Sequence, residues 1–247
     1  MEIKNRLESN LFGQLLAVIN LMVIVMLITK LYEDYRFIST PFLYMISCLL
    51  ILGFNFFVIF KFHRLTLFIL GLLEFLYLCF YGLELYIGHS IFFWIYPLLI
   101  WSLYDVLFPH VEVEKKKFAA QFLIASFYSS AGIQKIIGLY QTYEFNVSGY
   151  GLVEGLITDI YAKIPQLIME LIIKYQTIMN AGMIVVFLLQ AFAVILVFKI
   201  PNRYFGLFFI FFHAFNSFVL GVRFFEAVLA LGLFFLYQTS QERIKKL

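Results

Sequence analysis

Lys135 is the residue whose type and position most directly suggest chemistry. It ends the segment QFLIASFYSSAGIQK, in which small and polar residues recur at helical spacing along one narrow face: Gln121, Ala125, Ser129, Gly132 and Lys135. A lysine that is partly removed from water has a lowered pKa and can act as a general base. The alternative is a helix-packing seam, since small residues let helices approach closely, with Lys135 extending its charge to the polar end of the helix. The sequence leaves both interpretations open.

A second polar group lies in the segment FFIFFHAFNSFVLG. His213 is followed by Asn216 and Ser217 three and four residues later, so the three side chains share one helical face. Such a group is either a hydrogen-bonded knot between helices or the polar wall of a cavity. The position of His213 deep within an apolar run favours the cavity wall.

Glu74 and His89 complete the set of candidate residues. Glu74 lies inside an apolar run, RLTLFILGLLEFLYLCFY. A carboxyl group in such a run is a functional hypothesis by default, and it can also be protonated or paired. His89 belongs to a short turn, GHS, directly before the next apolar run. Taken alone, a histidine in a turn is usually a solvated residue.

Long apolar segments must position these residues. The chain has 247 residues, of which 63% are hydrophobic and 13% are charged, whereas a soluble domain is about 25% charged. No soluble core of this size could bury so much apolar surface, so the sequence predicts an all-α, polytopic transmembrane helical bundle. About eight spans are expected, at 11–29, 42–60, 65–85, 91–108, 118–134, 177–198, 204–221 and 224–238. We expect 1–247 to form a single domain.

The distribution of lysine and arginine predicts the orientation. With the N-terminus in the cytoplasm, the inner segments hold twelve of these residues and the outer segments hold six. Eight spans then place both termini in the cytoplasm, in a membrane that we expect to be the bacterial inner membrane. The long connection 135–176 faces outward, and its stretch LIMELIIKY is a candidate interfacial helix.

Three segments together resemble a known family. The segment SSAGIQKIIG looks like the AG-x-x-K segment of the vitamin K-dependent γ-carboxylase family and its wider horizontally transferred transmembrane (HTTM) domain. The segment FHAFNSFVLGVRFFEAVLALGLFF resembles the later FH-x-x-NS helix of that family, and the turn GHS is similar to its His-Ser turn. The segments follow the family order and cover residues 89–236.

The resemblance implies roles for particular residues. Lys135 matches the family's base, which deprotonates vitamin K hydroquinone, and His89 matches a histidine near that quinol. His213 and Asn216 match polar positions of the later helix. The implied protein has an outward-opening cavity that binds a quinol, such as menaquinol or a vitamin K-like molecule, or another lipid-like molecule. We expect Lys135 and His89 to be catalytic, and the expected substrate-binding residues are His213, Asn216, Ser217, Glu74 and Ser129.

A non-enzymatic function is the alternative. The same polar and small-residue faces could bind a membrane partner or an exported peptide, and HTTM-type proteins occur as membrane partners in peptide maturation. The sequence contains no metal-binding motif and no nucleic-acid signature. The expected partners are therefore membrane lipid, a quinone, and a membrane or secreted protein.

Overall fold

The protein is all-helical throughout the part that the structure describes. The computed structural model describes residues 2–33, 41–81, 92–142, 170, 174–220 and 225–238, and these ranges contain no strand. The chain divides into two compact units. Unit 1 comprises residues 1–121 and 237–247, and unit 2 comprises residues 122–236. The long helix α5, Val113–Thr142, begins in unit 1 and continues in unit 2.

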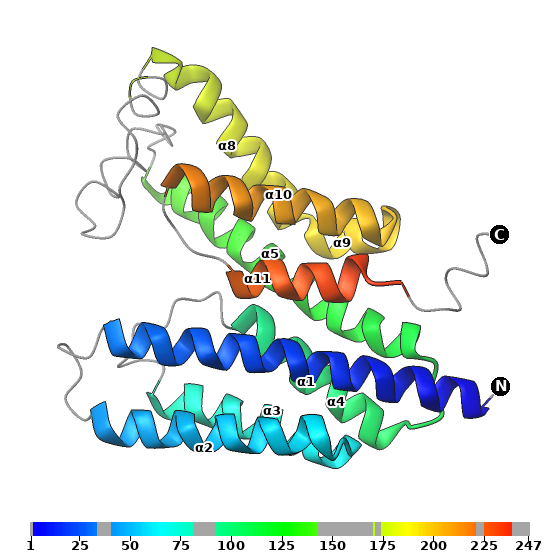
Figure 1. Cartoon of the computed structure of the whole chain (residues 1–247). Coiled ribbons are helices and arrows are strands. Elements are labelled where there is room, and N and C mark those ends of the chain that lie inside the picture. The colour runs from blue at the N-terminus through cyan, green and yellow to red at the C-terminus, as the bar shows by residue number, and fades with distance from the viewer. Residues whose placement is uncertain are drawn as a thin grey trace. The chain divides into compact units, whose positions relative to one another are not determined.

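Unit 1 is built from antiparallel neighbours along the chain. Its helices are α1 (Glu2–Glu33), α2 (Pro41–Phe60), α3 (Arg64–Tyr81) and α4 (Phe92–Leu107), together with the start of α5. Helix α1 packs on α2, and α3 packs on α4, with further contacts between α2 and α3 (Figure 1). Aromatic rings fill part of the core, where Phe12 lies against Trp101 and both are buried.

Unit 2 contains the remaining described helices. They are α8 (Gln176–Ala191), α9 (Ala193–Lys199), α10 (Asn202–Leu220) and α11 (Phe225–Leu231), which continues as a π-helical turn over Gly232–Leu236. Helix α10 packs against α11 and the π-helical turn (Figure 1). Stacked rings of Phe205 and Phe235, with centroids 4.8 Å apart, form part of this contact.

The chain bends by 69° between α8 and α9, at Phe192. The first backbone N–H groups of a helix have no partner within the helix. Here Ser129 of α5 supplies one, since its Oγ accepts a hydrogen bond from the Val194 N–H at 3.0 Å. Gly132, one turn further along α5, lies so close to the Ala191 backbone that a β-carbon at this position would collide with it. Ser129 and Gly132 therefore fix the bend.

The predicted helical stretches overlap observed helices, with three differences. The stretch predicted at 11–29 lies within a helix that extends over Glu2–Glu33, and the stretch predicted at 177–198 is divided into α8 and α9. The stretch predicted at 118–134 lies within α5, Val113–Thr142, so residues 135–142 of the predicted connection 135–176 are helical. The first prediction underestimated a helix because polar residues at both ends were excluded from the span. The second missed a bend because the run 177–198 is continuously apolar.

The predicted number of eight spans is not supported by the described helices. One helical segment, Arg6–Met26, is long and apolar enough to cross a membrane, or two if the bent pair α8 and α9 forms one span. Helix α4 has 16 residues, so it reaches about 24 Å, compared with about 30 Å for a bilayer core. Helices of this kind also form the cores of soluble proteins, and 44% of the Arg6–Met26 window is buried inside the protein.

Replacement of Gly132 by alanine should destabilise unit 2. The added methyl group meets the backbone of Ala191, which cannot move aside as a flexible side chain can, and overpacking of this kind costs about 1–3 kcal/mol. Gly182→Ala is the matched control, because nothing lies within 4 Å of the added β-carbon there. Gly182→Ala should leave the thermal unfolding midpoint of the purified protein unchanged or raise it, whereas Gly132→Ala should lower it. Equal midpoints would contradict the close approach.

Candidate functional site

Lys135 lies on α5 beside α8 in unit 2. Its Nζ donates a hydrogen bond to Gln190 Oε1 at 3.1 Å and lies 5.0 Å from the centroid of the Phe187 ring. Within the described ranges, its polar partner is thus a neutral amide, and its other contact is an aromatic face. Partial burial of the ammonium group lowers the pKa of Lys135, although the residue as a whole is exposed.

The rest of the predicted polar face serves helix packing. Ser129 is buried and binds the start of α9, and Gly132 admits the end of α8. Ala125 is also fully buried. The packing seam is thus present along this face, and Lys135 stands at its end. The role of Ser129 in substrate binding stays a prediction. Its hydroxyl oxygen already accepts a hydrogen bond from the Val194 N–H.

His213 lies on α10 and is buried against α5. Its Nε2 is 2.5 Å from the Tyr128 hydroxyl oxygen, in a hydrogen bond between the two helices. The Tyr128 ring stacks on Phe209, with ring centroids 3.9 Å apart. The charge of Lys135 also acts electrostatically on His213. Lys135 and His213 both belong to unit 2, and their participation in one cavity stays a prediction.

Three candidate residues are described only in part or not at all. Asn216 and Ser217 belong to the backbone of α10, but their side chains lie outside the described part of the chain. His89 also lies outside the described residues, as does 143–169 within the long connection 135–176. Of the candidate interfacial stretch, the structure describes Glu170, Lys174 and Tyr175.

Glu74 lies in unit 1, on α3, and is buried. Its Oε1 accepts a hydrogen bond from Asn20 Nδ2 of α1 at 2.5 Å. The Oδ1 of Asn20 in turn accepts a hydrogen bond from the Trp94 indole N–H of α4 at 2.6 Å. This chain of hydrogen bonds joins three helices. Because Glu74 belongs to unit 1, its predicted participation in one site with Lys135 stays a prediction.

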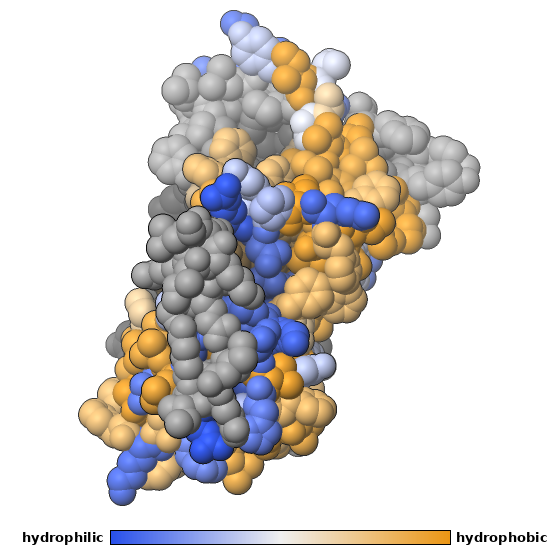
Figure 2. Space-filling model, turned by 90° about the vertical axis from the view of Figure 1, so that its right-hand side faces the viewer, coloured by the Kyte–Doolittle hydropathy of each residue, from blue (hydrophilic) through white to orange (hydrophobic). Residues whose placement is uncertain are grey.

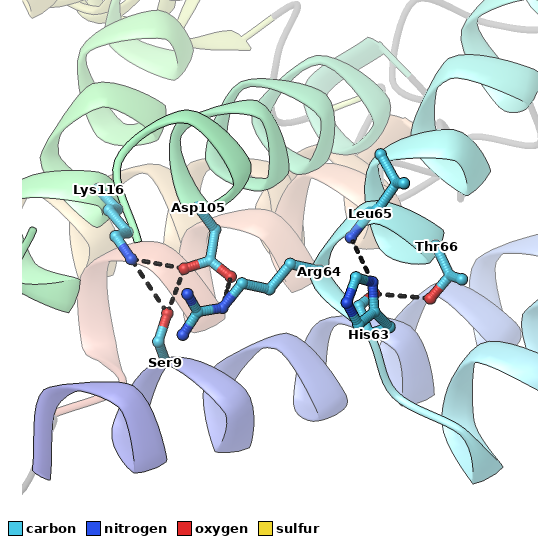
Figure 3. A network of polar contacts seen from close by, with 7 residues as sticks. All are labelled: Ser9, His63, Arg64, Leu65, Thr66, Asp105 and Lys116. Atoms are coloured by element: carbon cyan, nitrogen blue, oxygen red, sulfur yellow. Dashed lines mark hydrogen bonds and ion pairs between the residues drawn. The ribbon is translucent and has the colours of Figure 1, made fainter. Parts of the chain in front are cut away.

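A buried cluster of charges occupies another part of unit 1 (Figure 3). Asp105 of α4 accepts hydrogen bonds from Lys116 Nζ and Ser9 Oγ, each at 2.5 Å, and Arg64 Nε lies 3.1 Å from its other oxygen. Asp105, Lys116 and Ser9 are fully buried or nearly so. Burial lowers the pKa of Lys116, and the hydrogen bond and charge of Asp105 oppose this shift.

The turn before α3 places Arg64 in this cluster. The His63 carbonyl oxygen accepts a hydrogen bond from Thr66 Oγ1 at 2.6 Å, and His63 Nδ1 accepts one from the Leu65 N–H at 3.3 Å (Figure 3). The second bond supplies a partner for the Leu65 N–H, one of the first-turn groups that have none within the helix. Arg64 is therefore held at the helix end, from which its guanidinium group reaches Asp105.

The residues that the sequence did not reveal are mainly neutral partners. Gln190, Tyr128 and Asn20 each bind one of the predicted residues, from 55, 85 and 54 positions away in the chain. Each lies in an apolar run without a motif. An unpaired polar group in an apolar interior is costly, so each predicted polar residue must have a partner. The sequence does not show which residue that partner is.

The arrangements differ in their chemical capability. Unit 1 holds a carboxyl group among neutral partners and a buried cluster of one carboxylate with two cationic side chains. Unit 2 holds a lysine near a tyrosine–histidine pair, which are groups that can accept and donate protons. Among the described residues, no group of three histidine, cysteine, aspartate or glutamate side chains could hold a metal ion.

Comparisons with known proteins add no relationship. No protein-family model, no curated protein and no solved structure matches the chain. The resemblance to the HTTM family therefore remains a prediction based on its three segments.

Replacement of Asp105 by asparagine should strongly destabilise unit 1. It leaves Lys116 and Arg64 without their carboxylate, and removal of one partner from a buried ion pair typically costs about 3–5 kcal/mol. Glu112→Gln is the control, since the Glu112–Lys115 pair is 3.7 Å apart with a largely exposed lysine, and such pairs contribute about 0–1 kcal/mol. Thermal unfolding should show a large decrease for Asp105→Asn and a small one for Glu112→Gln. The reverse order would contradict a structural role for the cluster.

Proposed function

We propose that this chain is an integral membrane protein. The support is that many large hydrophobic side chains are exposed, while several polar side chains are buried in a core that is otherwise hydrophobic. Large hydrophobic residues are on the outside, with Leu50, Phe60 and Phe211 exposed to 70%, 82% and 72%, and hydrophobic side chains cover much of the visible described surface (Figure 2). Polar residues are on the inside, including Asn20, Glu74 and His213. Such an arrangement is unfavourable in water and favourable in lipid.

Within this proposal, the eight helical stretches are eight membrane crossings, with both termini in a bacterial cytoplasm. The bent pair α8 and α9 is one broken span. The shorter helices cross the membrane with polar groups at their ends, which the charged cluster and the connecting segments supply. The proposal is supported by the excess of lysine and arginine in the inner segments, which is twelve against six.

The proposed topology can be tested by reporter fusions. Fusions after residues 62, 116 and 247 should all report a cytoplasmic location, because each follows an even number of proposed spans. An alkaline phosphatase reporter, which is active only outside, should be inactive at these positions and active after residue 89. Activity after residue 62 or 116 would contradict the eight-span topology.

We further propose that Lys135 acts as a general base toward a quinol or another weakly acidic, lipid-like molecule. The observation that carries this proposal is the identity of its partner: Lys135 donates to the neutral amide of Gln190, not to a carboxylate. A carboxylate would hold the lysine in its charged form far more strongly than the amide oxygen does, and the amide oxygen also accepts a hydrogen bond from a neutral amine. In the proposed step, the O–H bond of the quinol breaks and its proton is transferred to neutral Nζ.

The HTTM resemblance belongs to this proposal, with His89 orienting the quinol and His213, Asn216 and Ser217 forming a polar wall. The Tyr128–His213 hydrogen bond supports a polar region beside Lys135. A membrane subunit that binds a protein or an exported peptide is the second candidate. It is favoured by the use of Ser129 and Gly132 in helix packing, because these residues are then not available to a small molecule.

The two candidates differ in what accompanies the purified protein. Organic extraction of the protein, purified in mild detergent, should release a stoichiometric quinone if the quinol proposal is correct. A protein that co-purifies without quinone would instead support the subunit.

The base proposal predicts that Lys135→Arg abolishes quinol chemistry. Arginine retains the charge and a donor for Gln190, but it cannot lose its proton near neutral pH. Menaquinol oxidation by oxygen in protein-containing nanodiscs should proceed faster with a base, since the quinolate anion is the form that is oxidised. We expect Lys135→Arg to lower this rate by about 100-fold or more, with quinone binding retained.

Lys174→Arg is the matched control, because Lys174 lies near Tyr175 in a cation–π contact and has no proposed role in proton transfer. It should leave the rate unchanged. An unchanged rate in Lys135→Arg would contradict the base and leave Lys135 as an anchor at the end of the packing seam.

A further inference from the structure

Glu74 is a buried acid that has no cationic partner in the described part of unit 1. The ion pairs there belong to Asp105 and to the acidic residues near the start of α5. Arg64 lies ten residues earlier in the same helix, about 15 Å away along the axis, and its guanidinium group is bound to Asp105. Asn20 donates to Oε1 of Glu74, while Oε2 is buried and has no hydrogen-bond partner.

Four helices surround a small cavity beside this carboxyl group. Its lining residues are Ile24 of α1, Cys48 and Ile51 of α2, Glu74 and Tyr77 of α3, and Ile95 of α4, and its volume is about 10 Å³. A volume of this size is at the lower limit for one water molecule, and the surface that lines it is almost entirely apolar. The other titratable groups at the cavity are Cys48 and Tyr77, which bind each other, since Cys48 Sγ donates to Tyr77 Oη at 3.2 Å. The residues from α1 and α4 bring no charge to it.

These surroundings stabilise the neutral acid. A carboxylate without a cation in an apolar interior is very costly, and the group then takes up a proton instead. The neutral acid needs only ordinary hydrogen bonds, and the one from Asn20 to Oε1 serves either form. Because Asn20 Oδ1 accepts a hydrogen bond from the Trp94 indole N–H, its Nδ2 is the atom that faces Glu74. In the neutral acid the proton lies on Oε2, the oxygen that Asn20 does not bind.

We infer that Glu74 is a reversible proton-binding site of unit 1, which takes up and releases its proton at Oε2. On release, the O–H bond at Oε2 breaks, the proton is transferred to water, and the carboxylate keeps its hydrogen bond from Asn20. On uptake, the same steps run in reverse. This inference is independent of the base proposed at Lys135, which belongs to unit 2.

A protonated carboxyl group in an apolar site has a specific reactivity. Dicyclohexylcarbodiimide is an apolar reagent that reacts with the neutral acid. The carboxyl proton moves to a carbodiimide nitrogen, the carboxyl oxygen adds to the central carbon, and the acyl group then migrates to nitrogen. The product is a stable adduct that retains the whole mass of the reagent, so mass spectrometry of peptides can locate it.

The test treats the full-length protein in lipid nanodiscs with this reagent at about pH 7. An ordinary exposed glutamate has a pKa of about 4.3, so only about 0.2% of it is protonated at this pH. Glu112, which is half-exposed and paired with Lys115, is the internal control. We expect at least about 100-fold more adduct at Glu74 than at Glu112. The labelling at Glu74 should decrease in alkaline buffer, and a water-soluble carbodiimide should not label it.

The variants sharpen this test. Glu74→Gln should lose the adduct entirely, and Glu112→Gln should leave the Glu74 adduct unchanged. The unmodified protein carries the main result, so the test does not depend on the stability of a variant. Labelling ratios near one, or labelling of Glu74 only after unfolding in detergent, would overturn the inference. Protection of Glu74 by sodium at constant pH would also overturn it, because the ligand would then be a metal cation.

Discussion

Polar groups in this chain must find their partners inside the helical units, because the helices present mainly hydrophobic side chains on the outside. Asp105 illustrates this constraint: it gathers Lys116, Arg64 and Ser9 from three other helices. Glu74 is joined to Asn20 and, through it, to Trp94. Each of these contacts fixes the rotation and the depth of the helices that provide it, so a small number of polar residues determines how a largely featureless apolar surface packs.

The same constraint separates the three polar centres by function. The carboxylate of Asp105 is paired with two cationic side chains, Lys116 and Arg64, so its loss is expected to destabilise the helices that it joins. Lys135 and Glu74 lack an opposite charge in the described residues, and both are bound by a neutral amide, from Gln190 and Asn20 respectively. A neutral partner fixes the protonation state of a titratable group less strongly than an opposite charge does. All three centres join helices, and they differ in whether the partner of the titratable group is charged or neutral.

The sequence predicted the helical class and, from its long apolar runs, the approximate place of the described helices. It did not predict the bend at Phe192, because the residue that stabilises it, Ser129, lies 65 positions from Val194. It identified Lys135, His213 and Glu74 by their unusual polarity, but not Gln190, Tyr128 and Asn20, which are ordinary residues in apolar runs. Polarity shows where a partner is required, whereas only the packing shows which residue is the partner.

Two consecutive lysines at the start of α5 illustrate a different property. Lys116 binds Asp105 and Ser9, while Lys117 donates to the Tyr237 carbonyl oxygen at 2.7 Å. Neighbouring side chains of a helix point about 100° apart. The two ammonium groups therefore reach different acceptors, although both residues are lysines. A single-residue insertion before Lys116 would barely alter composition or hydropathy, yet it would turn both groups away from their acceptors. The two lysines therefore fix the rotation of α5 about its axis, so this part of the helix should not tolerate an insertion or deletion of one residue.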